Sequence, residues 1–537
     1  MQLNKSIERS REVWQKAGYK LPEFDRTQIA QNTYENPEWI HFGAGNIFRA
    51  FQANVVQKLL NEGVLKTGLI VAEGYDYEII QKMNRPHDEY SILVTLKANG
   101  TIEKTVIGSI MESLTVDECN EDDRQRLVQI FQADSLKMVS FTITEKGYSL
   151  RDGQGRLLPN VQTDFELGPN GASSYIGKLT ALVYERFMVG QKPLALVSMD
   201  NCSHNGDKLY DAVNEFATVW EKSGLVEAGF VAYLNNPKQI TFPWTMIDKI
   251  TPRPDEGVKS LLAADGIKDL DQVITTKNTY VAPFVNAEEP EYLVIEDAFP
   301  NGKLPLDKAG VIYTDKNTVD QVEKMKVCTC LNPLHTALAI YGCLLGYQLI
   351  SKEMENPFLK KLVETIGYQE GLPVVVDPKI IKPKEFIDEV IQVRIPNPFM
   401  PDTPQRIATD TSQKMPIRYG ETIKAYVKSD SLDVNELTCI SLVIAGWFRY
   451  LCGMDDLGNT MELSSDPLME ELQTALQGIE FGNPSSVKDQ LKPLLSRKEL
   501  FGSDLYEVGI GERIEAMFAE MLQGPGAVIK TLTKYVK

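Results

Sequence analysis

Residues 37–49 read PEWIHFGAGNIFR, a short apolar run that passes directly into a glycine turn. An apolar stretch with helical spacing follows, carried by Phe51, Val55, Val56, Leu59 and Leu60. A second apolar strand is expected over residues 68–72, with Glu73 at its end. This order of strand, turn, helix and strand is typical of the first part of a parallel dinucleotide-binding sheet.

The glycine turn and the acid after the second strand predict a cofactor site. Gly43 allows a tight turn, and Gly45 lets the backbone approach a pyrophosphate over the helix N-terminus. Phe48 stands where a third glycine is common, which predicts a helix held slightly farther from its strand. Glu73 can accept from both ribose hydroxyls and repels a 2′-phosphate, which favours NAD over NADP. The residues expected at the cofactor are Gly43, Gly45, Asn46, Ile47, Phe48, Arg49 and Glu73.

These two signals have simpler interpretations. A plain strand-to-helix turn would also place two glycines at residues 43 and 45. Glu73 could be an exposed loop acid, and Asp76 is an alternative partner for the ribose.

Apolar runs and their spacing predict two domains of different character. Further strands are expected at 90–96, 105–110, 138–144 and 194–199, with helical segments between several of them, which favours a doubly wound α/β fold. After about residue 317 helices dominate, at 322–350, 435–452 and 514–521, and strands are expected only at 374–376 and 391–395. Residues 299–313, with two prolines and two glycines, are the best candidate linker. We therefore expect a Rossmann-like domain with an N-terminal extension over 1–312 and a mostly helical domain over 313–537.

Composition excludes several classes of function. The chain has 537 residues, and its 43% hydrophobic and 24% charged residues are typical of a globular protein with more than one domain. A net charge of −18 argues against a nucleic-acid or anionic-membrane partner. The N-terminus lacks the apolar core of a secretory signal, and no run of about 18 apolar residues predicts a membrane span. Seven scattered cysteines favour free thiols in a reducing cytoplasm, and only four histidines disfavour a metal site. The sequence has no coiled-coil heptad pattern, so we expect a monomer or a weak oligomer.

A second cluster of polar residues lies in the apolar sequence EKMKVCTCLNPLHTALAIYG, residues 323–342. A partly desolvated lysine such as Lys326 can exchange a proton with an alcohol near neutral pH. Asn332 and His335 can donate to an oxygen that gains negative charge. Without this apolar context, a lysine and a histidine would indicate only a solvated helix face. Polar groups inside an apolar helix cost free energy unless they are paired or functional, which favours a catalytic role here.

Four more residues are candidates for substrate contacts. Asn201 follows the apolar strand at 194–199, where parallel sheets bind ligands. Asp248 lies among apolar residues in TFPWTMIDKITP, residues 241–252. Helix capping or turn formation is the alternative role for both. Arg406 and Lys414 could neutralise a substrate carboxylate, although without context they are surface charges.

Seven motifs together resemble one family, the polyol-specific long-chain dehydrogenases, also called the mannitol dehydrogenase family. They occur in order over about residues 37–470: HFGAGNIFRAF (41–51), TITEKGY (142–148), SMDN with NG (198–206), FPWTMIDKITP (242–252), FPNGKLP (299–305), EKMK with LNPLHTALA (323–339) and IATDTSQKMPIR (407–418). The resemblance implies a Rossmann-like N-terminal domain, a helical C-terminal domain, a site in the cleft between them and no metal.

The resemblance also implies residue roles. It makes Lys326 the general acid/base, Asn201 and Asn332 the pair that stabilises the oxyanion, and His335 and Asp248 the residues that orient the substrate. Two further roles follow at matching positions: Arg406 and Lys414 lie near the far end of the substrate, and Glu145 and Glu323 line a proton route to the lysine.

One departure from the family concerns the catalytic helix. Five residues, VCTCL, separate Lys326 from Asn332, whereas the family usually has four. One added residue rotates a regular helix by about 100°. We therefore predict a π-bulge or kink between Val327 and Asn332, favoured by Pro333. In a regular helix, Lys324 would compete for the catalytic role.

The substrate expectation rests on DTSQKMPIR, residues 410–418, which is most similar to the pattern of fructuronate reductases. The resemblance therefore implies NAD-dependent hydride transfer that interconverts D-fructuronate and D-mannonate. Tagaturonate reductase and mannitol 2-dehydrogenase activities are the alternatives within the family. An NAD-binding protein that has lost catalysis is the alternative from another class.

Overall fold

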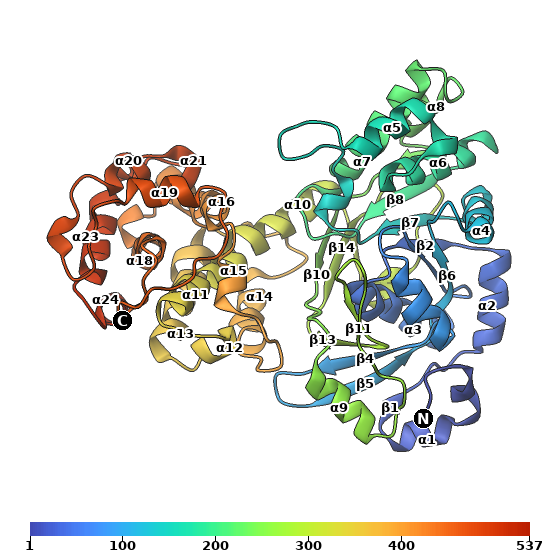
Figure 1. Ribbon diagram of the computed structural model, residues 1–537, viewed down its shortest axis with the longest axis horizontal. Helices are drawn as coiled ribbons and strands as arrows, with labels where there is room; N and C mark the ends of the chain where they lie inside the picture. Colours follow the sequence, from blue (N-terminus) through green and yellow to red (C-terminus); the bar gives the residue numbers. More distant parts are fainter. Residues whose placement is uncertain (537) are drawn as a thin grey trace. The chain divides into compact units, whose positions relative to one another are not determined.

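The computed structural model describes residues 1–536 and divides into two compact units, Met1–Asp320 and Gln321–Lys537. The named strands all lie in the first unit, while the second is built from helices (Figure 1). The boundary expected at 312/313 lies inside β15 (Ile312–Thr314). That strand pairs with β14 (Tyr292–Glu296) and so belongs to the first unit.

The main sheet of the first unit has six parallel strands in the order β6-β3-β2-β7-β8-β9. The strands are β2 (Trp39–Phe42), β3 (Leu69–Glu73), β6 (Ile110–Thr115), β7 (Met138–Phe141), β8 (Leu194–Ser198) and β9 (Ile240–Thr241). The direction of strand progression reverses between β2 and β7, as in doubly wound dinucleotide-binding sheets. The predicted Rossmann-like fold is therefore confirmed.

Successive side chains of a strand point to opposite faces of the sheet, so the core of the first unit forms two clusters, one on each face. On β2, Trp39 packs into one cluster, whereas Ile40 and Phe42 pack into the other. The first cluster contains α3 (Ala53–Asn61). The second is covered by α4 (Glu121–Gln132), α6 (Tyr175–Met188) and α7 (Asn205–Lys222). Helices on both faces explain why the parallel strands are apolar at nearly every position.

Two of the predicted strands form a separate sheet. The strands expected at 90–96 and 105–110 are the antiparallel hairpin β4 (Ser91–Leu96) and β5 (Ile102–Ile107). Gly100, at φ +86°, permits the tight turn that joins them, so they become neighbours instead of joining the parallel sheet. The complete sheet has the order β1-β5-β4-β13, with β1 (Tyr19–Lys20) and β13 (Phe284–Glu288) at its edges.

The rest of the first unit completes these layers. A three-stranded sheet joins β10 (Thr245–Asp248) to β14 and β15, and β11 (Val273–Ile274) pairs with β12 (Tyr280–Val281). The expected linker at 299–313 is instead part of this unit, because Leu304, Leu306 and Val311 are buried in its core. Its remaining α-helices are α1 (Arg11–Lys16), α2 (Arg26–Glu35), α5 (Pro159–Leu167), α8 (Phe230–Leu234), α9 (Glu256–Ala264) and the start of α10 (Lys316–Lys324).

The second unit packs around two apolar helices, α11 (Asn332–Leu344) and α18 (Thr438–Leu451), whose residues are almost all buried. The other α-helices are α12 (Ile350–Glu353), α13 (Pro357–Glu364), α14 (Pro383–Glu389), α15 (Pro404–Ile407), α16 (Thr411–Met415), α17 (Glu421–Lys428), α19 (Met469–Ala475), α20 (Leu491–Leu495), α21 (Lys498–Phe501), α22 (Leu505–Val508), α23 (Gly511–Met521) and α24 (Ala527–Tyr535). The helix Lys316–Leu344 is long and apolar enough to cross a bilayer by length and composition alone, but 78% of its apolar window is buried inside the protein.

Both strands predicted for the second unit are wrong. Residues 374–376 lie at the end of a short 3-10 helix and in the irregular segment after it. Residues 391–395 lie mostly in the π-helix η11 (Val390–Arg394), which continues α14. Val390 and Ile391 are buried there, so packing against the helical core decides the conformation over the strand propensity of β-branched residues.

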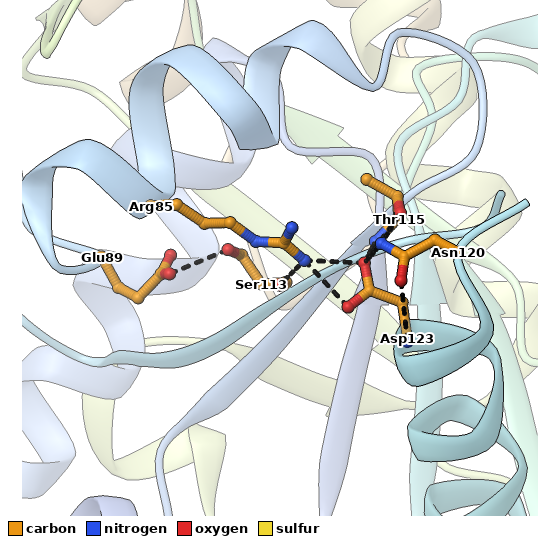
Figure 2. Close-up of polar contacts among 6 residues, drawn as sticks. All are labelled: Arg85, Glu89, Ser113, Thr115, Asn120 and Asp123. Carbon is orange, nitrogen blue, oxygen red and sulfur yellow. Dashed lines mark hydrogen bonds and ion pairs between the residues drawn. The ribbon is translucent and has the colours of Figure 1, made fainter.

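A buried carboxylate ties the end of β6 to two helical segments (Figure 2). Asp123 accepts hydrogen bonds from the backbone and hydroxyl of Thr115, both at 2.7 Å, and from Asn120 Nδ2 at 2.8 Å. Arg85 Nη2 lies 2.7 Å from the same carboxylate and also donates to the carbonyl of Ser113. Ser113 in turn donates to Glu89, so this network holds the edge of the parallel sheet in place.

Replacement of Asp123 by alanine is expected to lower the free energy of unfolding of the first unit by about 3 kcal/mol. The loss arises because the buried donors of Thr115 and Asn120 and the Arg85 cation lose their acceptor. Urea unfolding measures this effect. The exposed neighbour Asp122 serves as a control, whose alanine variant should change stability by less than about 0.5 kcal/mol. Equal effects for the two variants would contradict the role of the network.

Candidate functional site

A pocket of about 990 Å³ lies in the first unit at the carboxyl ends of β2, β3 and β7. This volume is at the upper end of the range of small-molecule sites, about 300–1,000 Å³. The strand order reverses at this point of the sheet, which is where doubly wound folds bind ligands. The residues that line the pocket include Gly43, Gly45, Glu73, Asp76, Thr142 and Tyr175.

The two glycines of the turn after β2 serve different purposes. Gly43 has φ +110°, and a Cβ there would stand 2.3 Å from the carbonyl oxygen of Thr142. Any side chain at this position would therefore disturb the neighbouring strand end. A Cβ on Gly45 would meet no protein atom within 4 Å. The missing side chain of Gly45 consequently leaves open space at the pocket, where a ligand could approach the backbone.

Phe48 occupies the position of the usual third glycine without disrupting the turn. Its ring stacks on His41 of β2, with centroids 4.6 Å apart and planes inclined by 10°. The helix begins at Asn46, passes through the π-helix η2 (Phe48–Gln52) and continues as α3. Complete burial lowers the pKa of His41 to about 3, so its ring is neutral and bonds to Ser140 and Thr142.

Arg49 and Asn46 hold the turn from inside the protein. Arg49 is buried, and its Nη1 donates to the carbonyl of Ala282 at 2.7 Å. Its Nη2 donates to Asn46 Oδ1 at 2.8 Å. Burial lowers the pKa of Arg49 to about 10. Ile47, between them, is half-buried.

The two candidate acids of the ribose site lie at the pocket and differ in their partners. Glu73 accepts hydrogen bonds from the backbone N–H groups of Ala44, Tyr75 and Asp76 at 2.8, 2.9 and 3.2 Å. Burial nevertheless raises the pKa of this carboxyl above its usual value. Asp76 accepts from the Thr275 hydroxyl through Oδ2, while its buried Oδ1 has no hydrogen-bond partner within residues 1–536. Asp76 therefore has an acceptor to offer a ligand, and Glu73 mainly holds the turn.

Asp200, which the sequence analysis did not single out, organises the loops after β7 and β8. It accepts from the backbone of Ile143 and Thr144 at 2.9 and 2.8 Å and from the Tyr148 hydroxyl at 2.5 Å. Its neighbour Asn201, the predicted oxyanion donor, is exposed. The signal was available, because an aspartate directly after a buried strand requires donors.

Asn205 connects these loops to the strand that holds Asp248. Its side chain is fully buried and donates to the carbonyls of Asp200 and Thr245 at 3.0 and 3.1 Å. Thr245 begins β10, and Asp248, which is also buried, ends it. The structure thus places Asn201 and Asp248 on two segments that Asn205 joins.

The predicted catalytic lysine lies in a wide helical turn of the second unit. Residues Met325–Cys330 form the π-helix η8, and the backbone N–H of Leu331 donates to the carbonyl of Lys326 at 3.1 Å. Leu331, at φ −129°, interrupts the helix before α11 starts at Asn332. The predicted π-bulge is therefore confirmed. Lys326 is only 3% exposed, whereas Lys324 is exposed.

Asn332 and His335 are half-buried in the first turn of α11, three residues apart and so on one face of the helix. The backbone of this turn is held from the side. The Tyr419 hydroxyl donates to the carbonyl of Pro333 at 2.6 Å, and Arg418 Nη1 donates to that of Asn332 at 3.5 Å.

The two predicted substrate cations have different surroundings. The side chain of Arg406 is 72% exposed and forms a two-pronged ion pair with Asp402, at 2.6 and 2.5 Å. Lys414 is half-buried and donates to the carbonyls of Ile407 and Thr409. Burial, and then the nearby Arg418, lower the pKa of Lys414 to about 8. Arg418, which belongs to the motif at 407–418, had been assigned no role.

Within residues 1–536, no group of three or more histidine, cysteine, aspartate or glutamate side chains is arranged to hold a metal ion.

Comparisons with known proteins place both units in one family. Residues 37–308 match the mannitol dehydrogenase Rossmann domain, and residues 318–522 match the mannitol dehydrogenase C-terminal domain. The D-mannonate oxidoreductase of Thermotoga maritima is 53% identical over 538 aligned positions, which cover 100% of this chain and 99% of the relative.

Solved structures show the same fold. A substrate-free D-sorbitol dehydrogenase, 24% identical, superposes with a TM-score of 0.78 over 96% of this chain and 98% of its own. The mannitol 2-dehydrogenase of Pseudomonas fluorescens, solved as a ternary complex with NAD and D-mannitol, is 25% identical. It gives a TM-score of 0.70 over 99% of both chains. The chain therefore belongs to the mannitol dehydrogenase family, as its motifs predicted.

Proposed function

We propose that the protein is an NAD-dependent oxidoreductase that interconverts D-fructuronate and D-mannonate. The observation that carries this proposal is 53% identity, along the whole chain, to a D-mannonate oxidoreductase. The sequence of residues 410–418 independently favours the same substrate. The mannitol 2-dehydrogenases of the family are more distant, for example 29% identical in Aspergillus fumigatus.

The pocket of the first unit fits a dinucleotide. The open space at Gly45 adjoins the helix that starts after it, whose first N–H groups can receive a pyrophosphate. Gly43, Asn46, Ile47, Phe48 and Arg49 shape this turn. The coenzyme, when bound, would supply the hydride as NADH or accept it as NAD⁺. Glu73 and Asp76 put two buried carboxylates at the pocket, which disfavours the 2′-phosphate of NADP.

Lys326 handles the proton of the reaction in this proposal. In the reduction its ammonium donates a proton to the carbonyl oxygen of the substrate, and in the oxidation its amine accepts the proton of the hydroxyl. The burial of Lys326 limits competition from water, which the exposed Lys324 would face. Asn201 and Asn332 are proposed to donate to the charged oxygen.

The remaining assignments are supported only by the family resemblance. His335 and Asp248 are proposed to orient the substrate, and Lys414 to bind its far end. The resemblance assigns Arg406 to the same end, but its guanidinium is already paired with Asp402. Glu145 and Glu323 are proposed to line the proton route. A cytoplasmic location, metal independence and a monomeric or weakly oligomeric state stay predictions from the sequence.

Consumption of NADH with D-fructuronate, D-tagaturonate and D-fructose tests the substrate. We expect kcat/KM to be at least about tenfold higher for D-fructuronate, since tenfold corresponds to about 1.4 kcal/mol of selective contacts. A higher value for either other substrate would transfer the assignment to it. Binding of NADH without turnover of any of them would instead support the non-catalytic alternative.

Replacement of Lys326 by alanine is expected to lower kcat for D-fructuronate by about 10²- to 10⁴-fold, the usual contribution of a general acid/base. The matched variant Lys324→Ala should change kcat by less than about threefold, because that side chain is exposed. Steady-state kinetics of both variants give the answer. Loss of activity in Lys324→Ala alone would assign the role to that residue.

Replacement of Gly45 by alanine is expected to keep wild-type stability but weaken NADH binding by about tenfold or more. The added methyl group meets no protein atom and occupies the space left for the ligand. Thermal unfolding and fluorescence titration with NADH measure the two effects. Gly43→Ala is the comparison, since its Cβ meets the Thr142 carbonyl and should destabilise the fold itself. Unchanged NADH affinity in Gly45→Ala would count against this cofactor site.

A further inference from the structure

We propose that Arg418, together with Lys414, binds the carboxylate of the sugar acid. This inference rests on the function proposed above and assigns the residues that select an acid over a neutral polyol. The sequence analysis paired Lys414 with Arg406 at the substrate carboxylate, and the structure favours Arg418 for that role instead.

The two cations lie close together in one continuous helical segment. Lys414 belongs to α16, and Arg418 to the π-helix η12 (Pro416–Gly420) that continues it. Residues four apart on successive turns share a helix face. Lys414 donates to the carbonyls of Ile407 and Thr409, and Arg418 donates to the Thr336 hydroxyl as well as to the carbonyl of Asn332. Each is thus held by neutral acceptors.

Neither cation forms an ion pair with a carboxylate within residues 1–536, although the chain contains 74 acidic residues and only 56 lysines and arginines. Other cations of this region are paired: Arg406 with Asp402, and Lys424 with Glu421 at 2.9 Å. Two acids lie near Lys414 without forming an ion pair with it, Asp410 and Asp466, and the Asp466 carboxylate accepts from the backbone and hydroxyl of Ser412.

Two partly buried like charges that form no ion pair disfavour each other, and an anionic ligand offsets that repulsion. Burial and then the neighbouring Arg418 lower the pKa of Lys414, while Asp410 acts in the opposite direction. Burial also lowers the pKa of Arg418 to about 10. The free energy of this pair of cations is therefore lower when a carboxylate is bound between them than when none is bound.

The guanidinium of Arg418 offers the edge that a carboxylate needs. Its Nη1 is engaged by Asn332 and Thr336, while Nε and Nη2 have no protein acceptor among the described residues and are not sealed from solvent. These two groups form the fork that binds both oxygens of a carboxylate. Arg406 uses the same edge for Asp402, so its fork is already occupied.

Arg418 lies next to the first turn of α11, where the reacting end of the substrate is proposed to bind. Its hydrogen bond reaches the backbone of Asn332, whose side chain is the proposed oxyanion donor. In D-fructuronate the keto carbon and the carboxylate are separated by the hydroxylated carbons of the chain. One end of the sugar acid can thus bind the cations while the other reaches the first turn of α11. A neutral polyol lacks the group that the cations bind.

The variants Arg418→Gln, Lys414→Gln and Arg406→Gln test this inference, with Lys424→Gln as the matched control of a paired surface lysine. We expect Arg418→Gln and Lys414→Gln to raise KM for D-fructuronate and the dissociation constant of D-mannonate by about 10- to 100-fold, as expected for a lost charged hydrogen bond. Arg406→Gln should raise them by less than about threefold, and Lys424→Gln should leave them unchanged. Arg418→Lys should recover part of the affinity because it keeps the charge.

Two results would overturn the inference. One is an Arg418→Gln variant that binds D-mannonate as tightly as the wild type. The other is a loss confined to kcat, with D-mannonate affinity unchanged, since that would mean that Arg418 acts only through the backbone of Asn332. Failure of the proposed function has a different signature, namely a wild-type enzyme that does not turn over D-fructuronate.

Discussion

Wide helical turns determine the direction of the side chains in three parts of the candidate site. In Phe48–Gln52, Met325–Cys330 and Pro416–Gly420 the backbone follows the π-helical pattern, in which an N–H bonds to the carbonyl five residues earlier. The backbone groups stay bonded, yet the residues after the turn are rotated relative to a regular helix. This geometry sets Phe48 against His41 and places the start of α11 after Leu331. Such turns are frequent at functional sites because they redirect side chains without leaving backbone groups unpaired.

Buried acids perform the corresponding task in the loops of the parallel sheet. Glu73 ends the buried strand β3, and Asp200 lies two residues after the buried strand β8. Both accept from backbone N–H groups of loops. A charged or strongly polar acceptor is costly to bury, so its donors must be in place. The loops at the ligand end of the sheet are consequently held by acids at the strand ends or just beyond them. Asp123 of α4 acts in the same way on Thr115, at the end of the edge strand β6.

Much of the fold could be predicted because it follows from spacing and periodicity. The apolar run before Gly43 and the alternation of apolar strands with helical segments predicted the parallel sheet. The number of residues between Lys326 and Asn332 predicted the wide turn. The strands at 374–376 and 391–395 were wrong because β-branched residues pack equally well on a buried helix. Arg418 was missed because its partners, a backbone carbonyl and a hydroxyl, lie far away in the sequence. Asp200 could have been found, because an aspartate so close to a buried strand requires donors.

The three backbone bonds of Glu73 have a consequence for how coenzyme preference can change. In dinucleotide folds the acid at this strand end is expected to bond to the ribose hydroxyls. Here the same carboxylate accepts from three backbone N–H groups, so a side chain without an acceptor would leave those donors unpaired. Selection for NADP would therefore have to act first on Asp76 or on residues that could replace those bonds. A substitution of Glu73 that altered coenzyme preference would therefore also alter the loop that this side chain holds.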